Sequence, residues 1–79
     1  MKIRKTNIED RESKVYIYEN KKEESFMTAI PDLEWSVFFT YEEEKAELLK
    51  KMQKGLTSKL DGAEAESLSL RIYNWTREM

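Results

Sequence analysis

The spacing of apolar residues changes abruptly at Thr40, and this change constrains the fold more than any other feature of the sequence. Before it, apolar residues occupy every second position, as on one face of a β-strand: Leu33, Trp35, Val37 and Phe39. After it, they follow the spacing of an amphipathic helix: Ala46, Leu48, Leu49 and Met52. The pattern predicts a strand that leads directly into a helix, with Trp35 as the most buried large side chain of that strand.

The residues around the first helix suggest where it begins and ends. Thr40 and Glu43 have the spacing of a capping box, in which each residue's side chain accepts the other's backbone N–H. We therefore expect the helix to begin at Thr40. Gly55 predicts an end near Lys54. The alternative is a helix that continues to Leu60, and the helix cost of glycine, about 1 kcal/mol, counts against it.

The best strand before this region covers residues 14–20. It places the aliphatic side chains of Val15 and Ile17 on one face and the aromatic rings of Tyr16 and Tyr18 on the other. If the aliphatic face packs on the core, the tyrosine side chains lie on the opposite face of the sheet.

Two further segments complete the expected sheet. Residues 25–30 form one strand after a short hairpin loop, and residues 2–8 form a weaker one. Ile3 and Ile8 have opposite parity, so we expect a bulge or a frayed edge, followed by a polar connector over residues 9–13. The short connections predict an antiparallel β-meander of three to four strands.

The last segment, residues 63–78, fits two kinds of structure. Three of its apolar residues alternate as in a strand: Leu68, Leu70 and Ile72. Five residues follow helical spacing instead: Ala65, Leu68, Ile72, Trp75 and Met79. Asp61 and Glu64 add a second capping-box pattern, so we predict a helix. The whole chain, residues 1–79, is then expected to be one α+β domain, with the meander followed by two α-helices packed on one sheet face.

Composition removes many functions. The chain has no cysteine and no histidine, which excludes disulfides, thiolate metal sites and Ser-His-Asp or Cys-His catalysis. Fourteen basic against 16 acidic residues give a net charge of −2, which argues against binding to nucleic acid through overall charge. The N-terminus lacks the apolar run of a signal peptide, and no stretch is long enough to cross a membrane. We expect a cytoplasmic protein.

Three groups of polar residues could suggest chemistry, and each has a simpler interpretation. Glu42, Glu43 and Glu44 are consecutive, so on a helix they fan apart and cannot converge on one metal ion. Ser58 and Lys59 are adjacent and diverge in the same way. Residues 74–76 form a glycosylation acceptor that a cytoplasmic chain would not use. We expect no enzyme, no cofactor and no metal.

Tyr16, Tyr18 and Phe38 form the most informative set. If the aliphatic residues face the helices, these three rings share the opposite face of the sheet. They could be covered by the second helix, bind another protein surface, or stack on the bases of RNA. We expect a protein-interaction or regulatory module that self-associates through Tyr16, Tyr18 and Phe38. The alternative is a nucleic-acid-binding module that uses the same face, and an enzyme with carboxylate and lysine chemistry is the least favoured class.

Three phrases of the sequence occur together in one known family. They are VYIYENKKEE at residues 15–24, AIPDLEWSV at residues 29–37 and IYNWT at residues 72–76. With these phrases the chain resembles the YueH-like family of small proteins from Gram-positive bacteria, over nearly its whole length. The resemblance implies a cytoplasmic bacterial protein without an assigned activity, and it carries over no catalytic residues.

Overall fold

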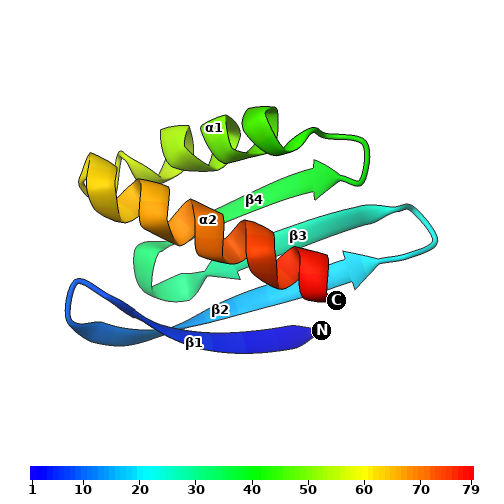
Figure 1. Cartoon of the computed structure of the whole chain (residues 1–79). Helices are drawn as coiled ribbons and strands as arrows, with labels where there is room; N and C mark the ends of the chain where they lie inside the picture. Colours follow the sequence, from blue (N-terminus) through cyan, green and yellow to red (C-terminus); the bar gives the residue numbers. More distant parts are fainter. The chain divides into compact units, whose positions relative to one another are not determined.

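Four antiparallel strands form one sheet in the order of the sequence, and two helices follow them (Figure 1). The computed structural model describes all 79 residues. They form two compact units, Met1–Glu43 and Glu44–Met79. The first unit contains β1 (Lys2–Ile8), β2 (Arg11–Asn20), β3 (Ser25–Ile30), the 3₁₀ turn η1 (Pro31–Leu33) and β4 (Trp35–Thr40). The second contains α1 (Lys45–Leu56) and α2 (Gly62–Glu78). The predicted α+β class, an antiparallel meander followed by two helices, is confirmed.

The hairpin of β1 and β2 is more regular than the sequence suggested. Pairing continues without interruption to Ile8 and Arg11, so the expected bulge or frayed edge is wrong. The expected polar connector is a two-residue turn, because Glu9 and Asp10 have φ angles of 51° and 64°, as a type I′ hairpin requires. Ile8 is buried and Ile3 is exposed, which explains their opposite parity.

Strand register divides the side chains of the sheet between a buried and an exposed face. The buried face carries the fully buried side chains Val15, Ile17, Thr28, Ile30 and Phe39. Phe39 is only 1% exposed and its ring stacks on that of Phe26, 5.3 Å away. Trp35 is half-buried, so the prediction that it is the most buried large side chain of its strand is wrong. Alternation identified the correct face but not the most enclosed position on it.

Thr28 is a polar residue at a fully buried position. Its hydroxyl has no hydrogen-bond partner in the chain, and a buried unpaired hydroxyl costs about 1–3 kcal/mol. Thr28→Val keeps the β-branched shape and removes the hydroxyl, so we expect the free energy of unfolding to rise by about 1 kcal/mol. Urea denaturation measures this change, and Thr28→Ser, which keeps the hydroxyl and loses the methyl group, should lower the stability.

At Thr40 the chain makes a turn and does not yet begin a helix. The Glu43 carboxylate accepts the Thr40 N–H at 2.9 Å, which is one half of the predicted capping box. The Glu43 N–H bonds to the Thr40 carbonyl at 3.3 Å and closes the turn. Helix α1 begins only at Lys45, and its N-cap residue Glu44 makes no side-chain capping bond. The change of period therefore marks the correct region, and the predicted start at Thr40 is wrong.

Helix α1 ends at Leu56, two residues beyond the predicted end, and contains Gly55. Its buried residues are spaced four apart: Leu48, Met52 and Leu56. Ala46 is exposed and Leu49 is half-buried, so the predicted apolar stripe is displaced around the helix. Burying a leucine side chain contributes about 1.5–3 kcal/mol, which outweighs the helix cost of Gly55 and explains why the helix continues.

Helix α2 confirms the helical interpretation of residues 63–78. The Asp61 carboxylate accepts the Glu64 N–H at 2.9 Å and caps the first turn. Its buried residues are Ala65, Leu68, Ser69, Ile72 and Thr76, while Trp75 and Met79 are half-buried. The two helices pack together, and the Lys45 ammonium lies 5.2 Å from the centre of the Tyr73 ring. Neither helix is long and apolar enough to cross a membrane.

The two candidate caps predict different effects of substitution. Asp61→Ala removes an acceptor from the first turn of α2 and is expected to lower the free energy of unfolding by about 1 kcal/mol. Thr40→Ala is the matched control, and we expect a much smaller loss because the Thr40 hydroxyl caps no helix. Urea denaturation of both variants measures the difference. Equal losses would show that Thr40 does act as a cap.

Candidate functional site

Large apolar side chains form a continuous row across the exposed face of the sheet. Tyr18, Met27 and Phe38 are paired in register across β2, β3 and β4, and they are 47%, 47% and 51% exposed. Ile3 is 54% exposed and is paired with the half-buried Tyr16 in the next row. We call these five residues, Ile3, Tyr16, Tyr18, Met27 and Phe38, the aromatic face. Tyr16, Tyr18 and Phe38 lie on the same face of the sheet, as their alternation predicted.

Met27 and Ile3 belong to this face but were not singled out from the sequence. Met27 alternates with the buried Thr28, and its parity on β3 was sufficient to place it beside Tyr18 once the register was known. The register of β1 was not predictable, because the expected bulge would have reversed the side on which Ile3 lies. The signal for Met27 was therefore in the sequence, and that for Ile3 was not.

Exposed side chains of these types are characteristic of binding surfaces. Aromatic residues and methionine are enriched in protein interfaces, because they bury large areas and adapt to the opposing surface. Isolated exposed apolar residues are common on any protein, whereas large contiguous apolar patches are characteristic of interaction sites. The pairing of Tyr18, Met27 and Phe38 makes this surface contiguous.

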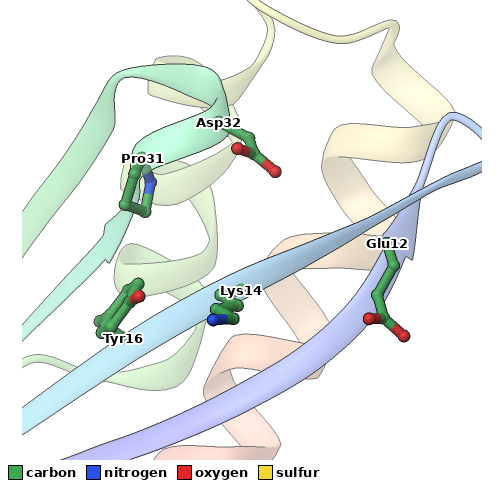
Figure 2. A pocket seen from close by; sticks show the side chains of 5 residues that line it. All are labelled: Glu12, Lys14, Tyr16, Pro31 and Asp32. Carbon is green, nitrogen blue, oxygen red and sulfur yellow. The ribbon is translucent and has the colours of Figure 1, made fainter.

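An open hollow of about 290 Å³ adjoins the aromatic face at Tyr16 (Figure 2). It is lined by Tyr16 and Lys14 of β2, by Pro31 and Asp32 of η1, and by Glu12. The charged side chains of Lys14, Asp32 and Glu12 are exposed. This end of the face can therefore form ion pairs with a partner, while the other end offers apolar contact.

The opposite side of the sheet has one polar group with altered acidity. The Tyr41 hydroxyl donates a hydrogen bond to the Glu19 carboxylate, and its ring lies 5.3 Å from that of Phe26. The pKa of Tyr41 is raised to about 12, chiefly because the Glu19 carboxylate holds the phenolic proton. Desolvation and the negative charges of Glu19 and Glu24 raise this pKa further. The Tyr41 hydroxyl therefore stays protonated at physiological pH, and its hydrogen bond joins the end of β4 to β2.

This pKa predicts how stability depends on pH in alkali. A raised pKa in the folded state contributes stability that is complete below the unfolded value of about 10 and is lost as pH rises through about 12. We expect Tyr41→Phe to lose less stability than wild type between these pH values. Denaturation at several alkaline pH values measures this, and titration of tyrosinate absorbance should show an ionisation near pH 12 that Tyr41→Phe removes.

The other polar groups considered in the sequence form no site. Glu42 and Glu43 lie in the turn before α1, and no group of three or more acidic side chains is placed to hold a metal ion. The Ser58 hydroxyl donates to the Gly55 carbonyl at 2.9 Å in the turn after α1. Asn74 is exposed on α2.

Comparison with known proteins identifies the family. The YueH-like protein family matches residues 2–78, which is nearly the whole chain. The chain belongs to the YueH-like family. It is 39% identical, over 82 aligned residues that cover the whole of both chains, to a Bacillus subtilis (strain 168) protein described as "Uncharacterized protein YueH". No solved structure matches the chain. The resemblance found in the three sequence phrases is thus confirmed, and the YueH-like family adds no activity to the site.

Proposed function

We propose that this protein is a small cytoplasmic bacterial interaction module, without enzymatic activity, that self-associates through the aromatic face. The observation that carries the proposal is the row of Tyr18, Met27 and Phe38, each about half exposed in a single chain. Covering this row with a second copy removes apolar surface from water, which favours association. A dimer also supplies buried surface to a chain of 79 residues, which is near the lower limit for independent folding.

The dimensions of the face indicate how strong the association should be. Four strands about 4.8 Å apart, with about six residues each at 3.4 Å, span roughly 19 by 20 Å. Stable interfaces bury about 800 Å² per partner, and the flat area of this face, about 380 Å², is roughly half of that. We therefore expect a weak dimer, with a dissociation constant of about 1–100 μM.

Sedimentation equilibrium of the wild-type chain tests the proposal. Over a range from about 1 μM to 1 mM, the mean mass should rise from the 9.5 kDa of one chain to twice that value. A mass of 9.5 kDa at every concentration would contradict self-association. A mass that rises beyond a dimer without limit would indicate aggregation and would equally contradict a closed dimer.

A nucleic-acid-binding module is the second candidate, because Tyr16 and Tyr18 share their face with Lys5 and Lys14. Stacked bases and phosphate contacts use such residues together. The overall negative charge argues against it. Titration with a short single-stranded RNA at low salt distinguishes the two: tight, salt-dependent binding that Tyr18→Ala weakens would favour the nucleic-acid function.

A further inference from the structure

We propose that two copies pack with their aromatic faces together about a two-fold axis. The axis lies in the interface between the two sheets, parallel to the strands and over the midline between β2 and β3. The proposal rests on the proposed self-association and adds the orientation of the two copies. It follows from the register of the sheet, the sizes of the paired side chains and the distribution of charge around the aromatic face.

The register determines which residues meet under this symmetry. Rotation about an axis along the strands exchanges β2 with β3 and keeps each residue at the same height along the strand. Each residue of β2 therefore faces, on the second copy, the β3 residue with which it is paired within the sheet. The interface is isologous, so every contact occurs twice.

The paired side chains have complementary sizes and chemistry. Tyr16 is paired with Ala29, so in the dimer the large ring of one copy lies over the small side chain of the other. Tyr18 is paired with Met27, which brings each thioether to the ring of the second copy, a favourable contact. Facing sheets are about 10 Å apart, and alternation of large and small side chains fills that space.

The charges at the end of the face are also complementary. Lys14 lies beside η1, and both line the hollow in which Asp32 is exposed (Figure 2). The two-fold rotation places Asp32 of the second copy over Lys14, and Lys14 of the second copy over Asp32. Two lysines and two aspartates then alternate around the axis, and each charge gains an opposite neighbour.

The other symmetrical arrangement has its axis across the strands, over the row of Tyr18 and Met27. Residues equally far from Tyr18 in opposite directions would then meet. Lys14 would approach Lys22 of the second copy, a like charge, and Asp32 would face the tip of the same hairpin, where Lys22 and Glu23 lie side by side and offer no net attraction. Like charges brought together at an interface oppose binding, so charge favours the axis along the strands, in which Lys14 and Asp32 each gain an opposite neighbour.

Two charge-reversing variants test the orientation. Lys14→Glu and Asp32→Lys each turn both ion pairs into repulsive pairs, so each variant alone should dimerise about tenfold more weakly than wild type. An equimolar mixture of the two variants re-creates both attractive pairs in the mixed dimer. Sedimentation equilibrium should show recovery of association in the mixture to within about threefold of wild type. Lys50→Glu and Glu66→Lys, both exposed on the helices, are the matched controls for change of net charge.

An unfolded variant would also dimerise weakly, so the stability of each variant has to be measured separately. Lys14 is paired across the strands with Lys5, so Lys14→Glu replaces two like charges with an opposite pair within the sheet. Thermal unfolding by circular dichroism should show that each variant is as stable as wild type. At about 1 M salt, the difference in dimerisation between the single variants and wild type should shrink.

The outcomes separate this inference from the proposed function. A wild-type chain that is monomeric overturns both. A wild-type dimer whose two variants do not complement each other in the mixture overturns the orientation and leaves self-association intact. Recovery in the mixture, with unchanged controls, supports the axis along the strands.

Discussion

Phe39→Ala is expected to destabilise the protein more than any other single truncation in the sheet. Phe39 is 1% exposed and stacks on Phe26, so its removal loses both the transfer free energy of the ring and the contacts around it. Truncation of a buried phenylalanine typically costs about 3–5 kcal/mol. For a chain of this length we expect the melting temperature to fall by more than about 12 °C. Because small domains have little stability to spare, much of the variant should be unfolded at physiological temperature.

Trp35→Ala and Phe39→Leu are the controls for this prediction. Trp35 belongs to the same strand and the same face but is half-buried, so its truncation should cost clearly less than that of Phe39. Phe39→Leu keeps an apolar group in the site and should lose a smaller part of the stability. Circular dichroism melts of the three variants give the order. If Trp35→Ala melts at or below the temperature of Phe39→Ala, the assignment of Phe39 as the most buried side chain of β4 is wrong.

The Tyr18→Glu, Phe38→Glu double variant is expected to be monomeric and folded. Both side chains are about half exposed in the single chain, so glutamate is tolerated there. In the dimer the same positions are removed from water, and an unpaired charge at a desolvated contact is costly. We expect the dissociation constant to rise at least about a hundredfold, which corresponds to ~2.8 kcal/mol. Sedimentation and circular dichroism measure the association and the fold.

The matched control places the same two charges on a helix. Ala63 and Leu70 are exposed on α2, so an Ala63→Glu, Leu70→Glu variant adds equal charge without changing a residue of the aromatic face. Its dissociation constant should stay within about threefold of that of wild type. A double variant of Tyr18 and Phe38 that unfolds would show that these rings are covered within their own chain. Equal weakening by both double variants would show that net charge, and not the aromatic face, controls association.

The strands with clear alternation were predictable from sequence, and the turns were not. Residues 15–18 alternate between aliphatic and aromatic side chains, and in β2 the aliphatic ones lie on the buried face and the aromatic ones on the exposed face. The turn at Glu9 and Asp10 needs positive φ at both residues, for which glycine and asparagine are the usual signals. Without such residues the sequence looks like a polar connector, and the true start of β2 at Arg11 is hidden.

The helix boundaries show a second limit of local patterns. Thr40 and Glu43 do form one bond of the capping box, but the same bond also stabilises a turn that does not continue as a helix. At the other end, local propensity favoured a stop before Gly55, and burial of Leu56 prevailed. At Asp61 the local pattern was sufficient, because its carboxylate caps α2 as the sequence predicted.

The candidate site was predictable in its aromatic part and not in its charged part. Tyr16, Tyr18 and Phe38 share a face by parity alone. The proximity of Lys14 and Asp32 depends on the register of β2 with β3 and on the turn η1, which no local pattern specifies. The charges that orient the proposed dimer thus became visible only in the folded chain.

A dilution series followed by nuclear magnetic resonance tests most directly whether the aromatic face is the surface of self-association. The chain is diluted from about 1 mM to 10 μM, across the expected dissociation constant. We expect the signals of Tyr18, Met27 and Phe38 to shift with concentration along a single dimerisation curve, while those of Leu70 stay constant. Signals of the aromatic face that do not move, or shifts confined to the exposed residues of α2, would contradict self-association through this face.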